Sequence, residues 1–477
     1  MSLGELVFAS ALEQAELIRS RQLSPVELVS AYLERIEDLD PELNAFVTVR
    51  GEEALADARL AEDATGELPL FHGVPLPIKD LTRTAGIRTT FSSKAFAQHV
   101  PDEDAAVVRR LRRAGFVLLG KTNTCEFGTI AVTESELNGA CRNPWDTQVT
   151  PGGSSGGAAA AVAAGLVSAA QGTDGGGSIR IPASCCGLFG LKPARGRVSN
   201  APYGDGSVAL STSGPITRTV ADAAAILDVM AGYEWGDAQW APPPDRPFLT
   251  DVDAEPGVLR IALATLPPVD VPVDPACVRA TENAAALLTG LGHEVEEASP
   301  AWRADDFFSL FLRVWQLGPA MYPVDEPGLL EAHNRAFVER AASTSSIEYG
   351  RTVLRLQMLA RSLAAFFADY DALLTPTLAL PPVPVGSTLE DPEGPVQASI
   401  RFTPFTAVAN LTGQPAVSLP LGRCDDGVPA GVQVIGRPAD ESTLLRVSAQ
   451  VERARPWRDA RPPAPFGTVP RPARPSA

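Results

Sequence analysis

The chain has 477 residues and a mass of 50.2 kDa, enough to bury a large core. Its 45% hydrophobic and 20% charged residues are typical of a globular protein and exclude a disordered or fibrous chain. The 57 acidic against 40 basic residues give a formal charge of −17 without a basic stripe, which argues against nucleic acid as the main ligand.

The sequence predicts a cytoplasmic protein without a membrane segment. The longest stretch of small and apolar residues, 158–170, is shorter than the ~20 residues that span a bilayer. Residues 1–20 lack the basic start and apolar run of a signal peptide. The six cysteines show no CxxC spacing, so we expect free thiols in a reducing compartment.

Predicted helices and strands alternate along the first part of the chain. The first 45 residues are expected to be helical, and Ser24 begins a capping box with proline at the first helical position. A strand is predicted over 74–78, followed by a helix capped by Asp104 and ended by Gly115. A second strand is predicted over 116–119. This alternation predicts an α/β fold.

A Gly- and Ser-rich segment at 151–157 leads into a predicted Ala-rich helix over 158–170. Apolar segments flank it, so buried turns close to a ligand explain the composition better than a flexible linker does. Further strands are predicted over 259–264, 372–377, 416–419 and 432–435, and a last helix over 440–451.

We expect a single domain over residues 1–460. The core of this domain is predicted to lie at about 65–235 and 370–455, with a helical elaboration at about 265–365. Residues 455–477 are rich in Pro and Arg and are expected to form a loosely held tail.

Lysine is rare: only Lys79, Lys94, Lys121 and Lys192 occur among the 40 basic residues. Arginine can replace lysine wherever a positive charge suffices, but it does not give up its proton in a protein. Each remaining lysine is therefore a candidate for chemistry or tight packing. All four lie between positions 79 and 192, and Lys79 stands at the end of the strand predicted over 74–78.

Two common hydrolytic sites do not fit the sequence. The four histidines show no HExxH or paired spacing, so no metal and no cofactor is expected. Residues 152–156 match the GxSxG motif of a nucleophile elbow, but a loop-like segment with Pro151 precedes it where that motif needs a strand. His293 and His333 lie in helix-like stretches and are poor candidates for its base.

A second glycine cluster, 172–180, can build an anion site. The consecutive glycines 175–177 before Ser178 can point several backbone N–H groups into one small volume, as an oxyanion hole requires. On spacing alone, a glycine turn with Ser178 as a helix N-cap explains the pattern equally well.

These segments closely resemble the amidase signature family. The resemblance is carried by PIKD (77–80), KTNTCEFG (121–128), RNPWD (142–146), GGSSGG (152–157), GTDGGGSIRIPASCCGLFGLKP (172–193) and VPAGVQVIGRPADE (428–441). It implies the amidase signature fold, a large mixed twisted β-sheet covered by helices on both faces. It also implies a Ser–cisSer–Lys triad, here Lys79, Ser154 with a cis peptide bond, and Ser178 as the nucleophile.

The triad has a chemical rationale. A neutral lysine whose pKa is lowered by burial can accept a proton from Ser154, which accepts one from Ser178 as it attacks a carbonyl. The N–H groups of Gly175, Gly176, Gly177 and Ser178 would hold the oxyanion. Ser155, Asp174 and Arg180 are supporting candidates. Gly175 departs from the family, which more often has Thr or another side chain there.

The resemblance implies a free-standing amide hydrolase that forms an acyl-enzyme. One alternative is the glutaminase subunit of a tRNA-dependent amidotransferase. That branch usually carries Met-Asp-Glu after Lys-x-Asn and Gln after Ser-Ile-Arg, where this chain has 124–126 Thr-Cys-Glu and Ile181. A second alternative is a catalytically silent binding protein on the same scaffold, which the intact triad disfavours.

The substrate is expected to be a small amide, with esters and carbamates as additional substrates. If some aromatic and flexible apolar side chains of 307–322 line the pocket, aryl or alkyl amides suit it best; core packing is the alternative for most of them. They are Phe307, Phe308, Phe311, Trp315, Met321 and Tyr322. No nucleic acid and no membrane partner is expected, and the protein is expected to be a monomer or homodimer.

Overall fold

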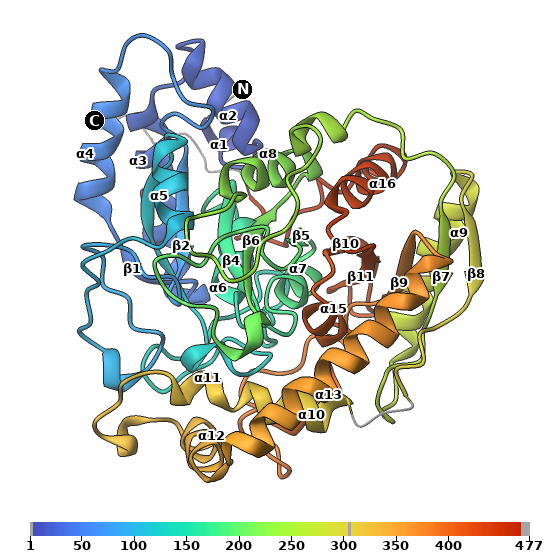
Figure 1. The fold of residues 1–477 in the computed structure, drawn as a ribbon. Helices are drawn as coiled ribbons and strands as arrows, with labels where there is room; N and C mark the ends of the chain where they lie inside the picture. Colours follow the sequence, from blue (N-terminus) through green and yellow to red (C-terminus); the bar gives the residue numbers. More distant parts are fainter. Residues whose placement is uncertain (1–2, 304–306, 469–477) are drawn as a thin grey trace.

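The computed structural model describes residues 3–303 and 307–468 and contains one mixed sheet of 11 strands in the order β1-β3-β2-β4-β6-β5-β10-β11-β9-β7-β8 (Figure 1). The strands are β1 Phe46–Val49, β2 Pro75–Lys79, β3 Val117–Thr122, β4 Ala169–Asp174, β5 Phe189–Lys192, β6 Thr212–Thr217, β7 Arg260–Leu263, β8 Glu294–Glu297, β9 Ala372–Pro376, β10 Ala416–Arg423 and β11 Pro429–Gly436.

Parallel pairing occurs in two parts of the sheet. Strand β2 pairs in parallel with both β3 and β4, and β7 pairs in parallel with β8 and β9. The remaining pairs are antiparallel. The parallel contact of β2 with β4 matters most, because it brings the carboxyl ends of two strands to one edge of the sheet.

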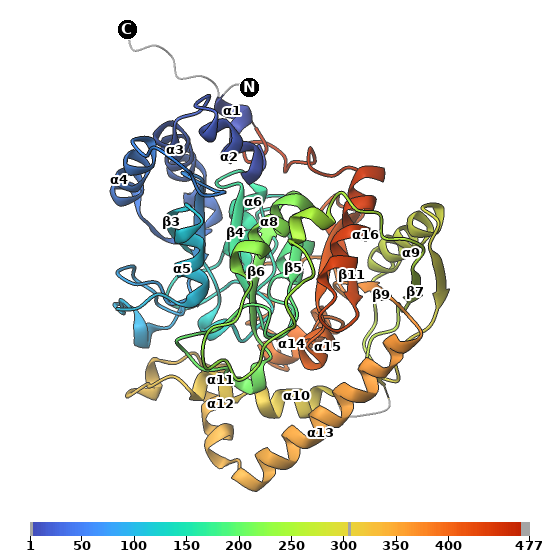
Figure 2. The ribbon, with the colours of Figure 1, turned by 45° about the horizontal axis from the view of Figure 1, so that its top comes forward.

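Helices cover both faces of the sheet, as predicted. Helices α6 and α7 pack together against one face, and α8 and α16 pack together on the other (Figures 1 and 2). The longer helices are α2 Ala11–Arg19, α3 Pro25–Leu43, α4 Gly51–Glu62, α5 Ala106–Arg113, α6 Gly156–Ala163, α7 Arg180–Cys186, α8 Val220–Met230, α9 Pro275–Gly290, α10 Phe307–Trp315, α12 Ala332–Ser343, α13 Ser346–Ala365, α14 Pro395–Phe402 and α16 Glu441–Ala454.

The short helices are α1 Leu3–Leu6, α11 Leu317–Ala320 and α15 Ala407–Thr412. Figures 1 and 2 show that α10, α11, α12 and α13 form a helical layer across one end of the molecule. This layer comes from the segment predicted as a helical elaboration. The segment also contains β8, which was not predicted from the sequence, and α9 connects β7 to β8 as a crossover between parallel strands.

Local sequence signals account for several helix ends. The capping box at Ser24 is present, and its hydroxyl accepts hydrogen bonds from Val26 and Glu27 N–H. The Asp104 cap is wrong: its carboxylate instead accepts from the N–H of Ala85 at 2.7 Å and from Arg112 Nε at 3.1 Å. Helix α5 therefore begins without a side-chain cap.

The helix predicted over 158–170 ends earlier than expected. Gly165 has a φ of 64°, and the N–H groups of Gly165 and Leu166 donate to the carbonyls of Val162 and Ala161. This is a Schellman motif, which terminates a helix. The chain then turns, and residues 169 and 170 enter β4.

Much of the predicted tail packs on the domain. Trp457 and Phe466 are buried, and Arg35 donates hydrogen bonds to the carbonyls of Phe466 and Thr468. The expectation of a loosely held tail is therefore wrong for residues 455–468, because their apolar side chains enter the core. Residues 469–477 lie outside the described residues.

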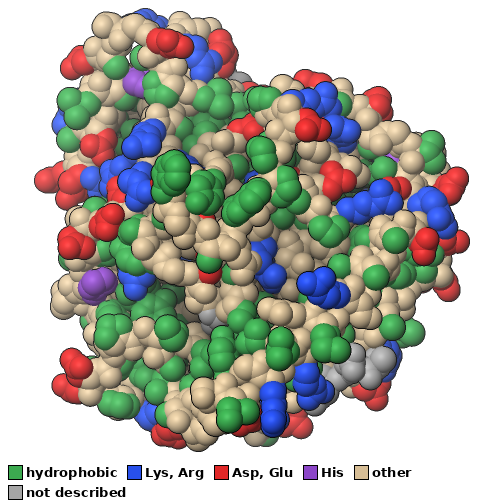
Figure 3. All heavy atoms as spheres, in the orientation of Figure 1, with side chains coloured by type: hydrophobic (Ala, Val, Ile, Leu, Met, Phe, Trp, Pro, Cys, Tyr) green, Lys and Arg blue, Asp and Glu red, His purple; other side chains and the backbone are tan. Residues whose placement is uncertain are grey.

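All six cysteines are buried and unpaired. None of the described helices is both long and apolar enough to cross a membrane. Figure 3 shows Lys and Arg side chains interspersed with Asp and Glu over one face, without a continuous basic stripe.

Candidate active site

The candidate site lies where β2 and β4 end. These strands are parallel neighbours with Ile78 opposite Gln171, so Lys79 at the end of β2 lies beside the segment that leaves β4. That segment is the glycine turn 175–177, and it leads through Ser178 into α7. The turn that carries Ser154 lies just before α6, which packs against β2 and β4. Three segments distant in sequence thus meet at one place.

Lys79 and Ser154 are in direct contact. The Nζ of Lys79 donates a hydrogen bond to Ser154 Oγ at 2.8 Å and another to Thr173 Oγ1 at 3.1 Å. The backbone N–H of Lys79 donates to Gln171 Oε1 at 3.0 Å, which fixes the strand end. Lys79 is fully buried, and both side-chain partners are neutral hydroxyls.

Burial lowers the pKa of Lys79 to about 7, against the smaller raising effects of Cys125 and Asp174. A buried ammonium loses its hydration, and no carboxylate within hydrogen-bond reach replaces it. Near neutral pH a large fraction of Lys79 is therefore an uncharged amine, which can accept a proton.

The pKa by itself does not single out Lys79. Burial also lowers the pKa of Lys121 to about 8 and that of Lys192 to about 7. The amine of Lys121 contacts Thr84 and Thr89 hydroxyls, and that of Lys192 contacts the carbonyl of Pro193. Contact with a serine of the glycine-rich segments is what distinguishes Lys79.

The peptide bond between Gly153 and Ser154 is cis. Position 153 accepts only glycine, because a Cβ there would lie 2.4 Å from the backbone of Val132. The tight approach of these two chain segments, together with the hydrogen bond from Lys79, fixes the position of the Ser154 side chain.

Ser178 follows the glycine turn and is 7% exposed. Its carbonyl accepts a hydrogen bond from Ser155 N–H at 3.1 Å, and Ser155 Oγ donates to the carbonyl of Thr173 at 3.2 Å. Ser155 therefore connects the Ser154 turn to both β4 and Ser178. Ser154 and Ser178 line one cleft together, but no hydrogen bond joins their hydroxyls in the described chain.

A buried ion pair holds the glycine turn. Arg180 Nη2 and Nε donate to the two oxygens of Asp174 at 2.8 and 3.0 Å. Burial alone would raise the pKa of Asp174, but the Arg180 guanidinium brings it well below its usual range. The same carboxylate accepts from the N–H groups of Gly177 at 2.8 Å and Ile179 at 3.1 Å.

The Asp174 carboxylate engages one of the four N–H groups predicted for an oxyanion hole and leaves three without a partner among the described residues. The N–H of Gly177 is already bonded to Asp174. The N–H groups of Gly175, Gly176 and Ser178 have no hydrogen-bond partner within residues 3–303 and 307–468. These three donors are available to a ligand.

Several residues of the site were not singled out from the sequence. Thr173 and Gln171 contact Lys79, and they belong to the same strand as Asp174. Thr406 Oγ1 donates to the carbonyl of Gly176 at 2.6 Å, and Asn410 Nδ2 donates to Asp174 Oδ1 at 2.9 Å. Thr173 lies within the motif 172–193 and Gln171 directly precedes it, whereas Thr406 and Asn410 had no signal in the sequence.

Two cavities open at Ser178. The larger, about 570 Å³, is also lined by Ser154, Thr173 and Gly175. The smaller, about 60 Å³, is mostly apolar, and its walls include Ile181, Phe308 and Phe311.

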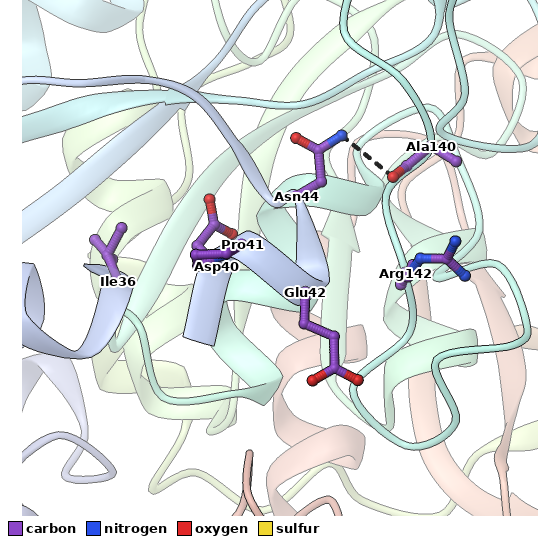
Figure 4. Close-up of a pocket in the computed structure, with 7 residues that line it drawn as sticks. All are labelled: Ile36, Asp40, Pro41, Glu42, Asn44, Ala140 and Arg142. Atoms are coloured by element: carbon purple, nitrogen blue, oxygen red, sulfur yellow. Dashed lines mark hydrogen bonds between the residues drawn. The ribbon is translucent and has the colours of Figure 1, made fainter. Parts of the chain in front are cut away.

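A third hollow, beside the end of α3, is lined by none of the candidate residues (Figure 4). There Asn44 Nδ2 donates to the carbonyl of Ala140 at 3.2 Å.

The four histidines are all engaged elsewhere. His72 contacts the carbonyl of Ala61, and His293 contacts Gln450. His99 packs on Phe91, and His333 contacts Thr129 Oγ1. No histidine base therefore contacts either serine, and the elbow interpretation fails on geometry.

Comparison with known proteins places this geometry among amide-cleaving enzymes. The family model described as Amidase matches residues 27–445. The structure of a 6-aminohexanoate cyclic dimer hydrolase complexed with substrate superposes with a TM-score of 0.90 at 37% identity, covering 96% of this chain and 99% of that one.

Two curated relatives represent different branches. The chain is 35% identical to an acylamidase of Rhodococcus erythropolis, over 97% of this chain and 98% of the relative. It is 36% identical to a glutamyl-tRNA(Gln) amidotransferase subunit of Carboxydothermus hydrogenoformans, over 96% of this chain and 99% of the relative. Overall identity therefore does not separate the two branches.

Proposed function

This chain belongs to the amidase family and is an amide-bond hydrolase, and from that premise we propose that it works through a Lys79–Ser154–Ser178 relay. The observation that carries the proposal is the 2.8 Å hydrogen bond between the buried Lys79 amine and Ser154 Oγ. Ser178 lines the same cleft as Ser154, beside three unengaged backbone N–H groups.

Acylation begins with neutral Lys79. As Ser178 Oγ attacks the carbonyl carbon, its proton passes to Ser154, and the proton of Ser154 passes to Lys79. The carbonyl oxygen becomes an oxyanion held by the N–H groups of Gly175, Gly176 and Ser178. Preorganised donors of this kind each contribute on the order of 3 kcal/mol to transition-state stabilisation.

Collapse of the tetrahedral intermediate breaks the C–N bond. The leaving nitrogen takes a proton from Ser154, which regains one from Lys79, and the amine departs. Water then attacks the acyl-enzyme by the same route and releases the acid. Since the carbonyl carbon and not the leaving atom is attacked, esters and carbamates are expected to react as well.

A free-standing hydrolase is favoured over an amidotransferase component. The residues after the Lys121-x-Asn123 motif differ from those usual in that branch, and Ile181 replaces its glutamine. Ile181 also lines the apolar cavity at Ser178. An apolar wall beside the reactive serine does not suit the amide head of glutamine, which needs hydrogen-bond partners when buried.

The test is a substrate panel on wild-type protein and Ser178→Ala. We expect hydrolysis of anilides and aryl esters, lost in the variant by at least about 1,000-fold. Aryl carbamates extend the panel. Glutaminase activity seen only with partner subunits, or an active Ser178→Ala protein, would contradict the proposal.

A further inference from the structure

The indole of Trp315 lies directly over the glycine turn. A Cβ built on Gly175 would lie 2.9 Å from Cζ3 and 3.0 Å from Cη2 of Trp315, closer than a real Cβ approaches another atom. At Gly176 the same ring atom Cη2 would be 4.0 Å away, an ordinary contact. The Trp315 ring thus occupies the space that a side chain at position 175 would need.

Two contacts fix the ring in this position. Trp315 stacks on Phe311, with ring centroids 5.3 Å apart and an interplanar angle of 22°. Its Nε1 donates a hydrogen bond to the carbonyl of Thr129 at 3.1 Å. Because Phe311 stacks on the face of the indole and the hydrogen bond holds its Nε1 edge, both the tilt and the in-plane rotation of the ring are restrained.

Trp315 also lines both cavities that open at Ser178. On one side is the apolar cavity of about 60 Å³. On the other is the cleft of about 570 Å³, whose walls include Arg83, Asn200 and Asp205. The indole is therefore a wall shared by a small apolar cavity and a large cleft with both polar and apolar walls.

The position of Ser154 decides which part of a substrate enters which cavity. Ser154 lines the large cleft and is not among the residues around the small cavity. In the proposed relay, the leaving nitrogen takes its proton from Ser154, so the amine portion lies in the large cleft. The acyl portion, on the other side of the attacked carbon, then enters the small cavity.

We propose that Trp315, seated over Gly175, is a specificity-determining residue that restricts the acyl group to a short apolar chain and leaves the large cleft for the amine. The substrate class is then an amide that joins a small apolar acid to a bulkier amine. This inference rests on the proposed function, since it takes Ser178 as the residue that attacks the carbonyl carbon.

The first experiment measures kcat/KM for p-nitroanilides with acyl groups from acetyl to decanoyl. Wild-type protein should prefer the short acyl groups. Trp315→Ala should raise the ratio of kcat/KM for the decanoyl to that for the propionyl substrate by at least about tenfold. One methylene group more or less in an apolar pocket changes kcat/KM by about that factor. Trp315→Phe, which keeps the stack on Phe311, should stay closer to wild type.

The second experiment separates a specificity role from a merely structural one. Gly175→Ala should lower kcat/KM by about tenfold with Trp315 present and have little effect in Trp315→Ala, a coupling that neighbouring residues show in a double-mutant cycle. Gly176→Ala is the matched control, because its Cβ meets only ordinary contacts and should show little coupling to position 315. A melting temperature of Gly175→Ala close to that of the wild type shows that the single variant folds.

The outcomes distinguish the two proposals. Unchanged acyl-length profiles in Trp315→Ala, or equal coupling at positions 175 and 176, would overturn the role of Trp315 while leaving hydrolysis by Ser178 intact. Full activity in Ser178→Ala would overturn the proposed function instead.

Discussion

Three buried lysines of this chain have lowered pKa values, and only their contacts separate them. Lys121 and Lys192 donate to hydroxyl and carbonyl oxygens that have no place in the relay, whereas Lys79 touches Ser154. A proton acceptor needs both a suitable pKa and a partner within hydrogen-bond distance. The contact with Ser154 therefore favours Lys79 over Lys121 and Lys192 as the proton acceptor that we propose.

Replacing Lys79 should abolish most activity. We expect Lys79→Ala to lower kcat at least about 100-fold, the usual contribution of a general base. Lys79→Arg should not restore it, because a guanidinium keeps its proton. The control is Lys94→Ala, since Lys94 is half-exposed and paired with Glu136. Comparable kcat in Lys79→Ala and Lys94→Ala would rule out Lys79 as the base.

At the scale of single residues, the candidates that the sequence offered are those that belong to long motifs. Lys79, Ser154, Ser178, Asp174 and Arg180 all lie within them. Thr406 and Asn410 could not be found, because they contact the glycine turn across 230 and 236 residues of sequence. The sequence also could not predict which backbone N–H groups of the turn are free of hydrogen bonds, because this depends on the orientation of the Asp174 carboxylate.

Single carboxylates connect separate elements of this fold. Both oxygens of Asp222 on α8 accept hydrogen bonds at 3.0 Å from the N–H groups of Ala11 and Leu12, at the start of α2. Asp228, two turns further along α8, accepts from Phe248 and Leu249 N–H in the same way. Each pair of N–H groups lies in the first turn of a helix, α2 or the short 3-10 helix Phe248–Asp251. Such groups have no hydrogen-bond partner within their own helix.

Asp222→Ala should therefore destabilise the protein by about 2 kcal/mol, because it leaves buried donors unsatisfied. Urea unfolding measures the loss, and hydrogen exchange should rise at residues 11 and 12. Asp228→Ala is the matched control and should raise exchange at residues 248 and 249 instead. Unaltered exchange at residues 11 and 12 in the first variant would contradict this account of α2.

Element types were easier to predict than their ends. The capping box at Ser24 acts over adjacent residues and was predicted correctly, and most strands lie within a few residues of their predicted ranges. The helix predicted over 158–170 was too long because Gly165 ends it in a Schellman motif, and residues 169 and 170 pair with β6 instead. Strands β1, β4, β5, β6 and β8 were not predicted, because their places in the sheet depend on partner strands that are not adjacent in the sequence.

Over the whole molecule, the described residues after α16 return to the N-terminal helices, where Arg35 of α3 donates hydrogen bonds to the carbonyls of Phe466 and Thr468. Trp457 is buried, and its Nε1 donates to the carbonyl of Arg218 at 2.9 Å. The proline- and arginine-rich composition of residues 455–477 suggested a loosely held tail. The buried aromatic side chains of Trp457 and Phe466 nevertheless anchor residues 455–468 on the domain. Composition alone does not reveal such anchors.

Trp457→Ala should consequently reduce the free energy of unfolding by about 3 kcal/mol through loss of buried area and a cavity. Trp235→Ala is the control, because Trp235 is 97% exposed and should change stability by less than about 0.5 kcal/mol. Equal melting temperatures for the two variants would show that residues 455–468 do not stabilise the domain.

The relay itself is tested most directly by the pH dependence of labelling with a fluorophosphonate, followed by peptide mapping. We expect a single adduct on Ser178. Its rate of formation should rise about tenfold per pH unit below pH 7 and level off above the pKa of Lys79, which is about 7, as the neutral amine accumulates. An adduct on another residue, or a rate that does not change across this range, would contradict the account.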